Sequence, residues 1–253
     1  MYLYLKSEII KIKRTNIRKV LLIIPLICSL LALGFNFLSG DPQIVSLSAE
    51  TIINHWGILW ISVFIALTAG LLNNLEKKST NFKTIIGLPI NLQKNEISRI
   101  LLVIGFVALG SLLLVAAISL TSLLIGTSPY LVSLSSCILA VFLMFVTSLW
   151  QVPFCLWFSR KTNFFITLLL NSMLNLNLGT LFAPTEDWWF VPYSWHLRVQ
   201  MPLTKLHSNG IPLPQNDELL SYSVIPIALV LSILFFIVLT LMAVRSFNKI
   251  EVK

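Results

Sequence analysis

Long apolar stretches without charge dominate the pattern of residues along the chain. Six stretches that contain no Asp, Glu, Lys or Arg are long enough to cross a bilayer core, which needs about 20 residues of helix. The third and fourth are longer than a span requires, which predicts tilt or bending, and Pro153 predicts a bend in the fourth. The pattern therefore predicts an all-α membrane protein with a single six-span domain over residues 1–253. The six stretches are Val20–Leu38, Ile53–Leu72, Ile100–Ile125, Tyr130–Phe158, Phe164–Phe182 and Tyr222–Val244.

The composition supports this prediction. Hydrophobic residues make up 57% of the chain and charged residues only 11%, against about 25% charged residues in a typical soluble domain. So few charged side chains cannot cover a soluble exterior, which excludes a soluble globular enzyme and a disordered chain. The three cysteines, Cys28, Cys137 and Cys155, lie inside apolar stretches without CxxC spacing, so we expect buried thiols rather than disulfides.

The charges between the predicted spans indicate the topology. Sixteen of the 18 Lys and Arg residues lie at the two termini or in the second and fourth connections, whereas six of the 10 acidic residues lie on the opposite side. The positive-inside rule therefore predicts that both termini are cytoplasmic. Topology and contact with anionic lipid headgroups explain the basic charge, so a nucleic-acid partner is not needed.

The chain shows no recognisable catalytic chemistry. No predicted span contains a carboxylate, lysine or arginine, which argues against a proton-driven antiporter. The HExxH, GxSxG and phosphate-loop motifs are also missing from the sequence. We therefore expect no enzymatic activity, no metal site and no cofactor bound by this chain, and any energy for transport must come from a partner.

Three amides form the most polar feature of the fifth stretch. Asn171 and Asn175 are spaced to share one helix face, and Asn177 follows closely. Such amides hydrogen-bond to neighbouring helices in most membrane proteins. The alternative is a polar lining for a substrate path.

The connection between the second and third stretches, residues 73–99, contains a short amphipathic segment. Phe82, Ile85, Ile86 and Pro89 follow the i, i+3, i+4, i+7 spacing of one helix face, and Gly87 with Pro89 ends the pattern. Such a helix can lie on lipid or fit a groove in another protein. Physical reasoning alone leaves both alternatives open.

Two further segments are too apolar for solvated loops. Residues 1–19 predict a basic amphipathic helix on the inner leaflet, with Tyr2, Leu5, Ile9 and Ile12 on one side. Residues 183–221 predict an outer loop whose aromatic side chains form either an interfacial belt or a contact for a lipophilic substrate. These aromatic residues are Trp188, Trp189, Phe190, Tyr193 and Trp195.

Taken together, the six spans, the basic helix before the first span and the 73–99 connection resemble the ABC-2 type permease subunits of ATP-binding-cassette exporters. In that family, an acid after span two and a short helix ending in Leu-Pro form the coupling helix, which enters a cleft on the ATPase. The resemblance also implies that residues 1–19 are an elbow helix and that residues 183–221 form re-entrant helices. Arg99 stands where the family commonly has a lysine at the start of span three. The positions that match the coupling helix are Glu76, Phe82, Lys83, Ile85, Ile86, Leu88 and Pro89.

Three strings, KSEIIKIKRT, WQVPFCLWFSRKTN and VPYSWHLRVQMPLTKLHSNGIPL, are similar to the E-type permeases of lantibiotic-immunity transporters. This resemblance implies a subunit that pairs with a second, G-type permease and with an ATPase dimer that carries ATP and Mg. The complex would expel a cationic amphipathic peptide from the plasma membrane of a Gram-positive bacterium. The alternatives are an exporter of another lipophilic drug or lipid, and a membrane immunity protein that sequesters the peptide without transport.

Overall fold

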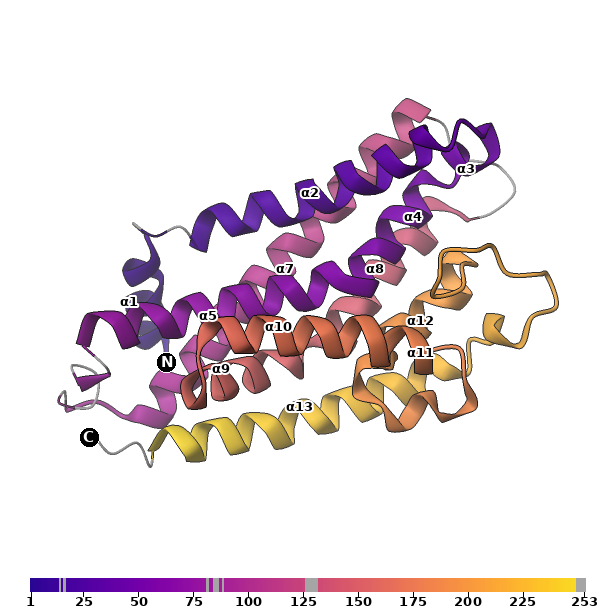
Figure 1. The fold of residues 1–253 in the computed structure, drawn as a ribbon. Helices are drawn as coiled ribbons and strands as arrows, with labels where there is room; N and C mark the ends of the chain where they lie inside the picture. Colours follow the sequence, from indigo (N-terminus) through magenta and orange to yellow (C-terminus); the bar gives the residue numbers. More distant parts are fainter. Residues whose placement is uncertain are drawn as a thin grey trace.

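The computed structural model describes residues 1–13, 15, 17–80, 82–83, 87, 89–125 and 132–248. These residues form an elongated helical bundle with the first and the last described residues at one end (Figure 1). We call this the termini end; it holds helix α1 (Tyr2–Ile12) and the last turns of α13 (Val224–Asn248). The opposite end holds the short helix α3 (Pro42–Ser46) and residues 183–221, and we call it the loop end. The described residues form no strand, which confirms the all-α prediction.

Five helices or continuous helical runs are long and apolar enough to cross a membrane, and a bent pair supplies a sixth span if it counts as one. The pair consists of α8 (Leu134–Ser148) and α9 (Gln151–Lys161), which meet at 42°. Pro153 explains the break, because its ring clashes with the carbonyl four residues earlier, at Leu149, and it has no N–H to donate. The predicted bend is thus confirmed. The five spans are Ile17–Leu38 (α2), Ser48–Ser79, Leu92–Leu123, Phe164–Phe182 and Val224–Phe247.

Several helices extend beyond the charge-free stretches that predicted them. Helix α7 (Leu92–Ile125) starts eight residues before Ile100, since the Asn91 side-chain oxygen accepts a hydrogen bond from the Lys94 backbone N–H at 2.9 Å. Hydropathy marks the residues that suit lipid, whereas a helix continues until its backbone hydrogen bonding ends. These charge-free stretches are therefore shorter than the helices that contain them. The helical spans contain Glu50, Glu96 and Arg99, all buried.

Each of two helical runs is interrupted by a wider, π-helical turn. The second span comprises α4 (Ser48–His55), the π turn η1 (Trp56–Trp60) and α5 (Ile61–Thr80). The fifth comprises α10 (Phe164–Leu174), the π turn η2 (Asn175–Gly179) and α11 (Thr180–Phe182). π turns are rare and are frequent at functional sites. The two π turns pack against each other near the loop end.

The 183–221 segment contains one α-helix rather than two. Short 3₁₀ turns, η3 (Glu186–Phe190) and η4 (Pro192–Ser194), lead into α12 (Trp195–Thr204), and η5 (Glu218–Leu220) precedes α13. All ten residues of α12 are buried, mainly against α8. The segment is therefore not a loop lying over the bundle: its helix is part of the packed interior at the loop end.

Candidate functional site

Buried opposite charges join three helices at the termini end. Glu96 of α7 pairs with Arg99, whose Nη1 lies 3.3 Å from Glu96 Oε2, and with Arg160 of α9. Glu8 of α1 lies on the other side of Arg99, with its Oε2 4.0 Å from Nε. These four side chains, which we call the charge network, are at most 4% exposed. Such burial is tolerated because each charge has an opposite charge beside it.

Helix α5 joins the charge network through two of its residues. Lys11 Nζ lies 2.7 Å from Glu8 Oε1 and 2.8 Å from Glu76 Oε1. Burial alone would lower the pKa of Lys11, but the two carboxylates raise it above its ordinary value. Asn73 accepts a hydrogen bond from Arg99 and donates one to the Leu156 carbonyl at 2.7 Å. The termini end is thus one connected polar structure built from α1, α5, α7 and α9.

The predicted coupling segment leaves the bundle directly from this structure. Glu76 is buried in it, whereas Lys83 and Pro89 are exposed. Phe82 differs from the prediction. Its φ of 64° is incompatible with a continuous helix stripe, and its ring is buried, 6.4 Å from that of Phe247. Phe82 therefore anchors the segment to the bundle. The centroid of its ring lies 6.0 Å from Cζ of the Arg99 guanidinium.

The other three predicted coupling residues, Ile85, Ile86 and Leu88, lie outside the described residues. The charge network, in contrast, was missed by sequence reasoning, which counted its members only as topology signals. Two pairs at this end, Glu96 with Arg99 inside the charge network and Glu8 with Lys11 at its edge, have the i, i+3 spacing that brings opposite charges together on a helix. From that spacing, these two pairs could have been predicted from the sequence.

A second polar network, made of neutral groups, lies around the two π turns. Asn175 Nδ2 donates to the carbonyls of Gly57 and Ile58 at 2.9 and 2.7 Å. The backbone at Gly57 is closely packed, because an added Cβ would lie 2.6 Å from Met144 Cε and 2.9 Å from Leu197 Cδ2 and would displace them. Wide turns free backbone carbonyls from the regular α-helical pattern. Here Asn175 uses two such carbonyls to hold η1 against η2.

Asn171 extends this network one turn along α10. Its Nδ2 donates to the Ser62 carbonyl at 3.0 Å and to Gln151 Oε1 at 2.9 Å, and its Oδ1 accepts from the Tyr193 hydroxyl at 3.0 Å. Asn177 is exposed and donates to the Met173 carbonyl of its own helical run at 2.8 Å. Asn171 and Asn175 thus hydrogen-bond to neighbouring helices, as most such amides do, whereas Asn177 does not join them.

Helix α12 contributes polar side chains to the same region. His196 Nε2 donates to the Gly57 carbonyl at 3.0 Å, and Gln200 Nε2 donates to Asn54 Oδ1 at 2.7 Å. Burial lowers the pKa of His196 to about 4, so the imidazole is neutral near pH 7. Burial likewise lowers the pKa of Arg198, although Asp217 opposes this effect; the Arg198 guanidinium donates to the Leu219 carbonyl at 2.8 Å. The sequence pattern did not reveal this buried role.

The five predicted aromatic residues fall into two groups. Trp188, Tyr193 and Trp195 are buried, and the Trp150 ring packs 4.8 Å from the Tyr193 ring. Trp189 and Phe190 are 52% and 76% exposed. The buried group holds η3, η4 and α12 against the bundle, so only Trp189 and Phe190 are available for lipid or substrate.

The described residues contain no group of three or more His, Cys, Asp or Glu side chains that could hold a metal ion. The geometry instead shows two polar networks at opposite ends of a membrane-spanning bundle. No curated protein and no solved structure matches the chain significantly. A model of the ABC-2 family transporter proteins, however, matches residues 4–177. This match covers more than half of the chain, which therefore belongs to the ABC-2 family of membrane transporters.

Proposed function

We propose that the chain is the permease subunit of an ATP-driven exporter, with the termini end facing the cytoplasm and an ATPase dimer. The observation that carries this proposal is the anchoring of the segment between α5 and α7. Glu76, at one side of the segment, and Arg99, at the other, belong to one buried polar structure, and Phe82 packs onto it. A segment that is held in this way passes a displacement on to the helices of the bundle and does not move independently of them.

The mechanism follows from this rigidity. ATP-driven closure of the ATPase dimer displaces the exposed part of the segment, and the charge network passes the displacement to α1, α7 and α9 together. Packed helices respond by shifting as units, because close-packed interiors do not deform continuously. The bend between α8 and α9 and the π turns near the loop end are the places where such a shift can be absorbed.

For the substrate we propose a cationic amphipathic peptide of the lantibiotic class, expelled by a complex that includes a second, G-type permease. The exposed acids Glu186 and Asp187 precede the exposed Trp189 and Phe190, and only the buried Trp188 separates them. Negative charge attracts a cationic peptide, and aromatic rings suit its apolar face at a half-wet surface. An exporter of another lipophilic compound and a non-transporting immunity protein are the alternatives.

The test of coupling is the double variant Ile85→Asp, Ile86→Asp, expressed with the ATPase and the second permease. We expect loss of ATPase copurification and of peptide tolerance, because two carboxylates would oppose docking of an apolar face. Lys161→Ala, an exposed change at the same end, is the control and should behave as the unmodified chain. Normal copurification with normal tolerance in the double variant would overturn the proposal.

The substrate is tested with the double variant Trp189→Ala, Phe190→Ala. We expect reduced tolerance to cationic lantibiotics while assembly with the ATPase is unchanged. Tolerance that is unaffected for a panel of lantibiotics, but lost for an apolar drug, would favour the alternative exporter. Full tolerance in cells whose ATPase cannot hydrolyse ATP would instead favour sequestration without transport.

A further inference from the structure

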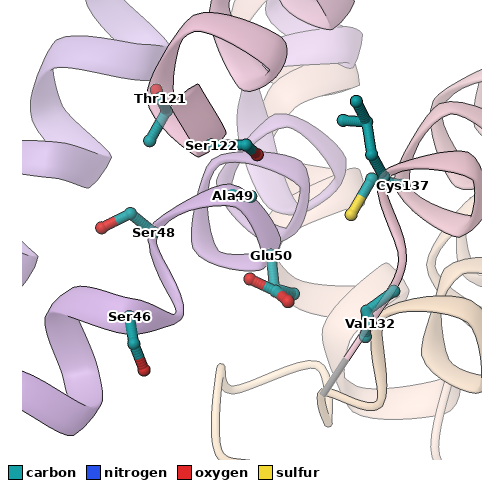
Figure 2. A pocket seen from close by; sticks show the side chains of 9 residues that line it. Ser46, Ser48, Ala49, Glu50, Thr121, Ser122, Val132 and Cys137 are labelled. Atoms are coloured by element: carbon teal, nitrogen blue, oxygen red, sulfur yellow. The ribbon is translucent and has the colours of Figure 1, made fainter. Parts of the chain in front are cut away.

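A small polar pocket lies at the loop end between α4, α7 and α8 (Figure 2). Glu50 of α4 lines it and is only 4% exposed. Among the described residues, its Oε2 atom has no hydrogen-bond partner, and the same is true of the buried hydroxyl of Ser122, on α7, which lines the same pocket. Two unpartnered buried polar atoms thus face one cavity.

The remaining polar groups of the pocket do not satisfy these two atoms. The hydroxyls of Ser48 and Thr121 donate to the carbonyls of Val45 and Ala117, at 2.6 and 2.9 Å. They keep lone pairs but have no proton left for the Glu50 carboxylate. None of the described residues that line the pocket is basic. The described lining therefore offers no positive charge to the Glu50 carboxylate.

Its size limits what can enter. The enclosed space, about 10 Å³, leaves room for one water-sized group. Val132 and Cys137 complete the wall beside the carboxylate (Figure 2). A divalent metal would keep several of its waters, for which the cavity has no room, and one carboxylate would leave half of its charge uncompensated. A small monovalent cation, in contrast, is neutralised by one carboxylate and needs only neutral oxygens besides.

The free-energy cost of burying the Glu50 carboxylate also favours a cation in this pocket. A buried carboxylate without a partner costs several kcal/mol in a protein interior, unless it takes up a proton or meets a positive charge. At the termini end every buried carboxylate of the charge network has Arg or Lys beside it. Glu50 has none among the described lining residues, but it has a cavity of the right size for a cation.

We propose that this pocket binds one small monovalent cationic group against Glu50, with Ser122 as a second ligand. The cation is either a dissolved alkali ion or the primary ammonium at the tip of a lysine side chain of the exported peptide; the latter source rests on the proposed function. In both cases the group fills the cavity and neutralises the carboxylate, which ties α4 to α7 and α8 when the site is occupied.

The test measures the Tm of the full chain, purified in detergent, at constant ionic strength in NaCl, KCl, methylammonium chloride or N-methyl-D-glucamine chloride, whose cation is too large for the cavity. We expect at least one small cation to raise the Tm by roughly 2–4 °C over N-methyl-D-glucamine. Glu50→Gln should abolish this difference, and Ser122→Ala should reduce the apparent affinity several-fold while the chain still folds. Glu186→Gln, an exposed acid at the same end, should retain the full response.

The source of the cation is separated by a second measurement, with N-methyl-D-glucamine as the only added salt cation. Stabilisation by a lysine-containing cationic peptide, but not by its lysine-acetylated form, would assign the site to the peptide ammonium. Stabilisation by alkali ions alone would assign it to a dissolved ion. A Tm that is equal in all cations and with both peptides, or a response that survives in Glu50→Gln, would overturn the proposal. Because this measurement needs no ATPase, its result is independent of the test of coupling.

Discussion

The two ends of the bundle bury polar groups by different physical means. The termini end uses full charges in pairs, Glu8, Glu96, Arg99 and Arg160, supplied by three helices. Around the π turns near the loop end, the structure instead uses neutral amides and an uncharged imidazole, which hydrogen-bond to backbone carbonyls of η1. Both networks are well connected, but only the one at the termini end consists of charged groups.

The difference teaches how each end can respond to force or to a ligand. Charge pairs in a buried site are strong when complete and costly when broken, so the termini end behaves as one rigid unit. Neutral hydrogen bonds to carbonyls of π turns cost less to rearrange, and several atoms there, including Asn175 Oδ1 and Gln200 Oε1, have no partner. The structure therefore combines a termini end held by charge pairs with a region around the π turns that is held by neutral hydrogen bonds.

The largest expected effect comes from breaking the charge network. Arg99→Leu leaves Glu8 and Glu96 buried beside fewer positive charges, so we expect a loss of about 3–5 kcal/mol in the free energy of unfolding. Lys161→Leu, an exposed cation at the same end, should stay within about 0.5 kcal/mol of the unmodified chain. Denaturant unfolding in detergent micelles measures both. Equal stabilities would mean that the termini end is not held together by charge.

Disrupting the neutral network around the π turns should lower the free energy of unfolding by a smaller amount. Asn175→Ala removes two hydrogen bonds to the carbonyls of Gly57 and Ile58 and leaves a small void. We therefore expect the free energy of unfolding to fall by about 2–3 kcal/mol. Asn177→Ala is a matched control two residues away, since the exposed Asn177 side chain donates its hydrogen bond within its own helical run; its effect on the free energy of unfolding should be close to zero. A similar loss in both variants, in the same unfolding assay, would contradict the assigned roles.

Close packing at the π turns gives a third test. In Gly57→Ala, the new Cβ would meet Met144 Cε at 2.6 Å and Leu197 Cδ2 at 2.9 Å, so we expect overpacking to cost about 1–3 kcal/mol. Gly34→Ala, on α2, meets nothing within 4 Å and should stabilise its helix by about 0.5–1 kcal/mol. The two Tm values should therefore move in opposite directions. A rise for Gly57→Ala would show that α12 is loosely seated.

The smallest effect concerns pH. His196 is neutral in the fold because burial holds its pKa at about 4, below the 6.5 of an unfolded chain. The stability that the neutral His196 contributes is complete above pH 6.5 and is lost as the pH falls toward 4. We therefore expect the free energy of unfolding to be about 1–2 kcal/mol lower at pH 5 than at pH 7. His196→Gln should remove this part of the acid sensitivity, whereas His207→Gln should keep it. Thermal unfolding at the two pH values provides the measurement.

Much of the fold was predictable because membrane insertion has a simple sequence signature. The fifth span has the bounds that were predicted, Phe164–Phe182, and the bend near Pro153 was expected from its missing N–H. The polar ends of the helices were not predictable, because hydropathy reports preference for lipid rather than the end of helical hydrogen bonding. As a result, Glu50, Glu96 and Arg99 appeared to lie outside the spans although they are buried within helices.

The candidate sites were predictable only in part, for a related reason. The five aromatic residues between 188 and 195 look alike in the sequence, yet Trp195 is 4% exposed and Phe190 is 76% exposed. Phe82 seemed to continue an exposed stripe, but its backbone turns it toward Phe247. A local pattern cannot reveal which side of a short turn meets the rest of the chain.

The sequence by itself determined that this chain spans a membrane as an all-α bundle and that it contains an amphipathic connection after the second span. It could do so because these features depend on local hydropathy and spacing. Only the tertiary structure decided which charges pair, which amides bridge helices and which carboxylate is left facing a cavity. Those outcomes depend on contacts between residues far apart in the chain, such as Lys11 with Glu76 and Asn175 with Gly57, and no local pattern encodes them.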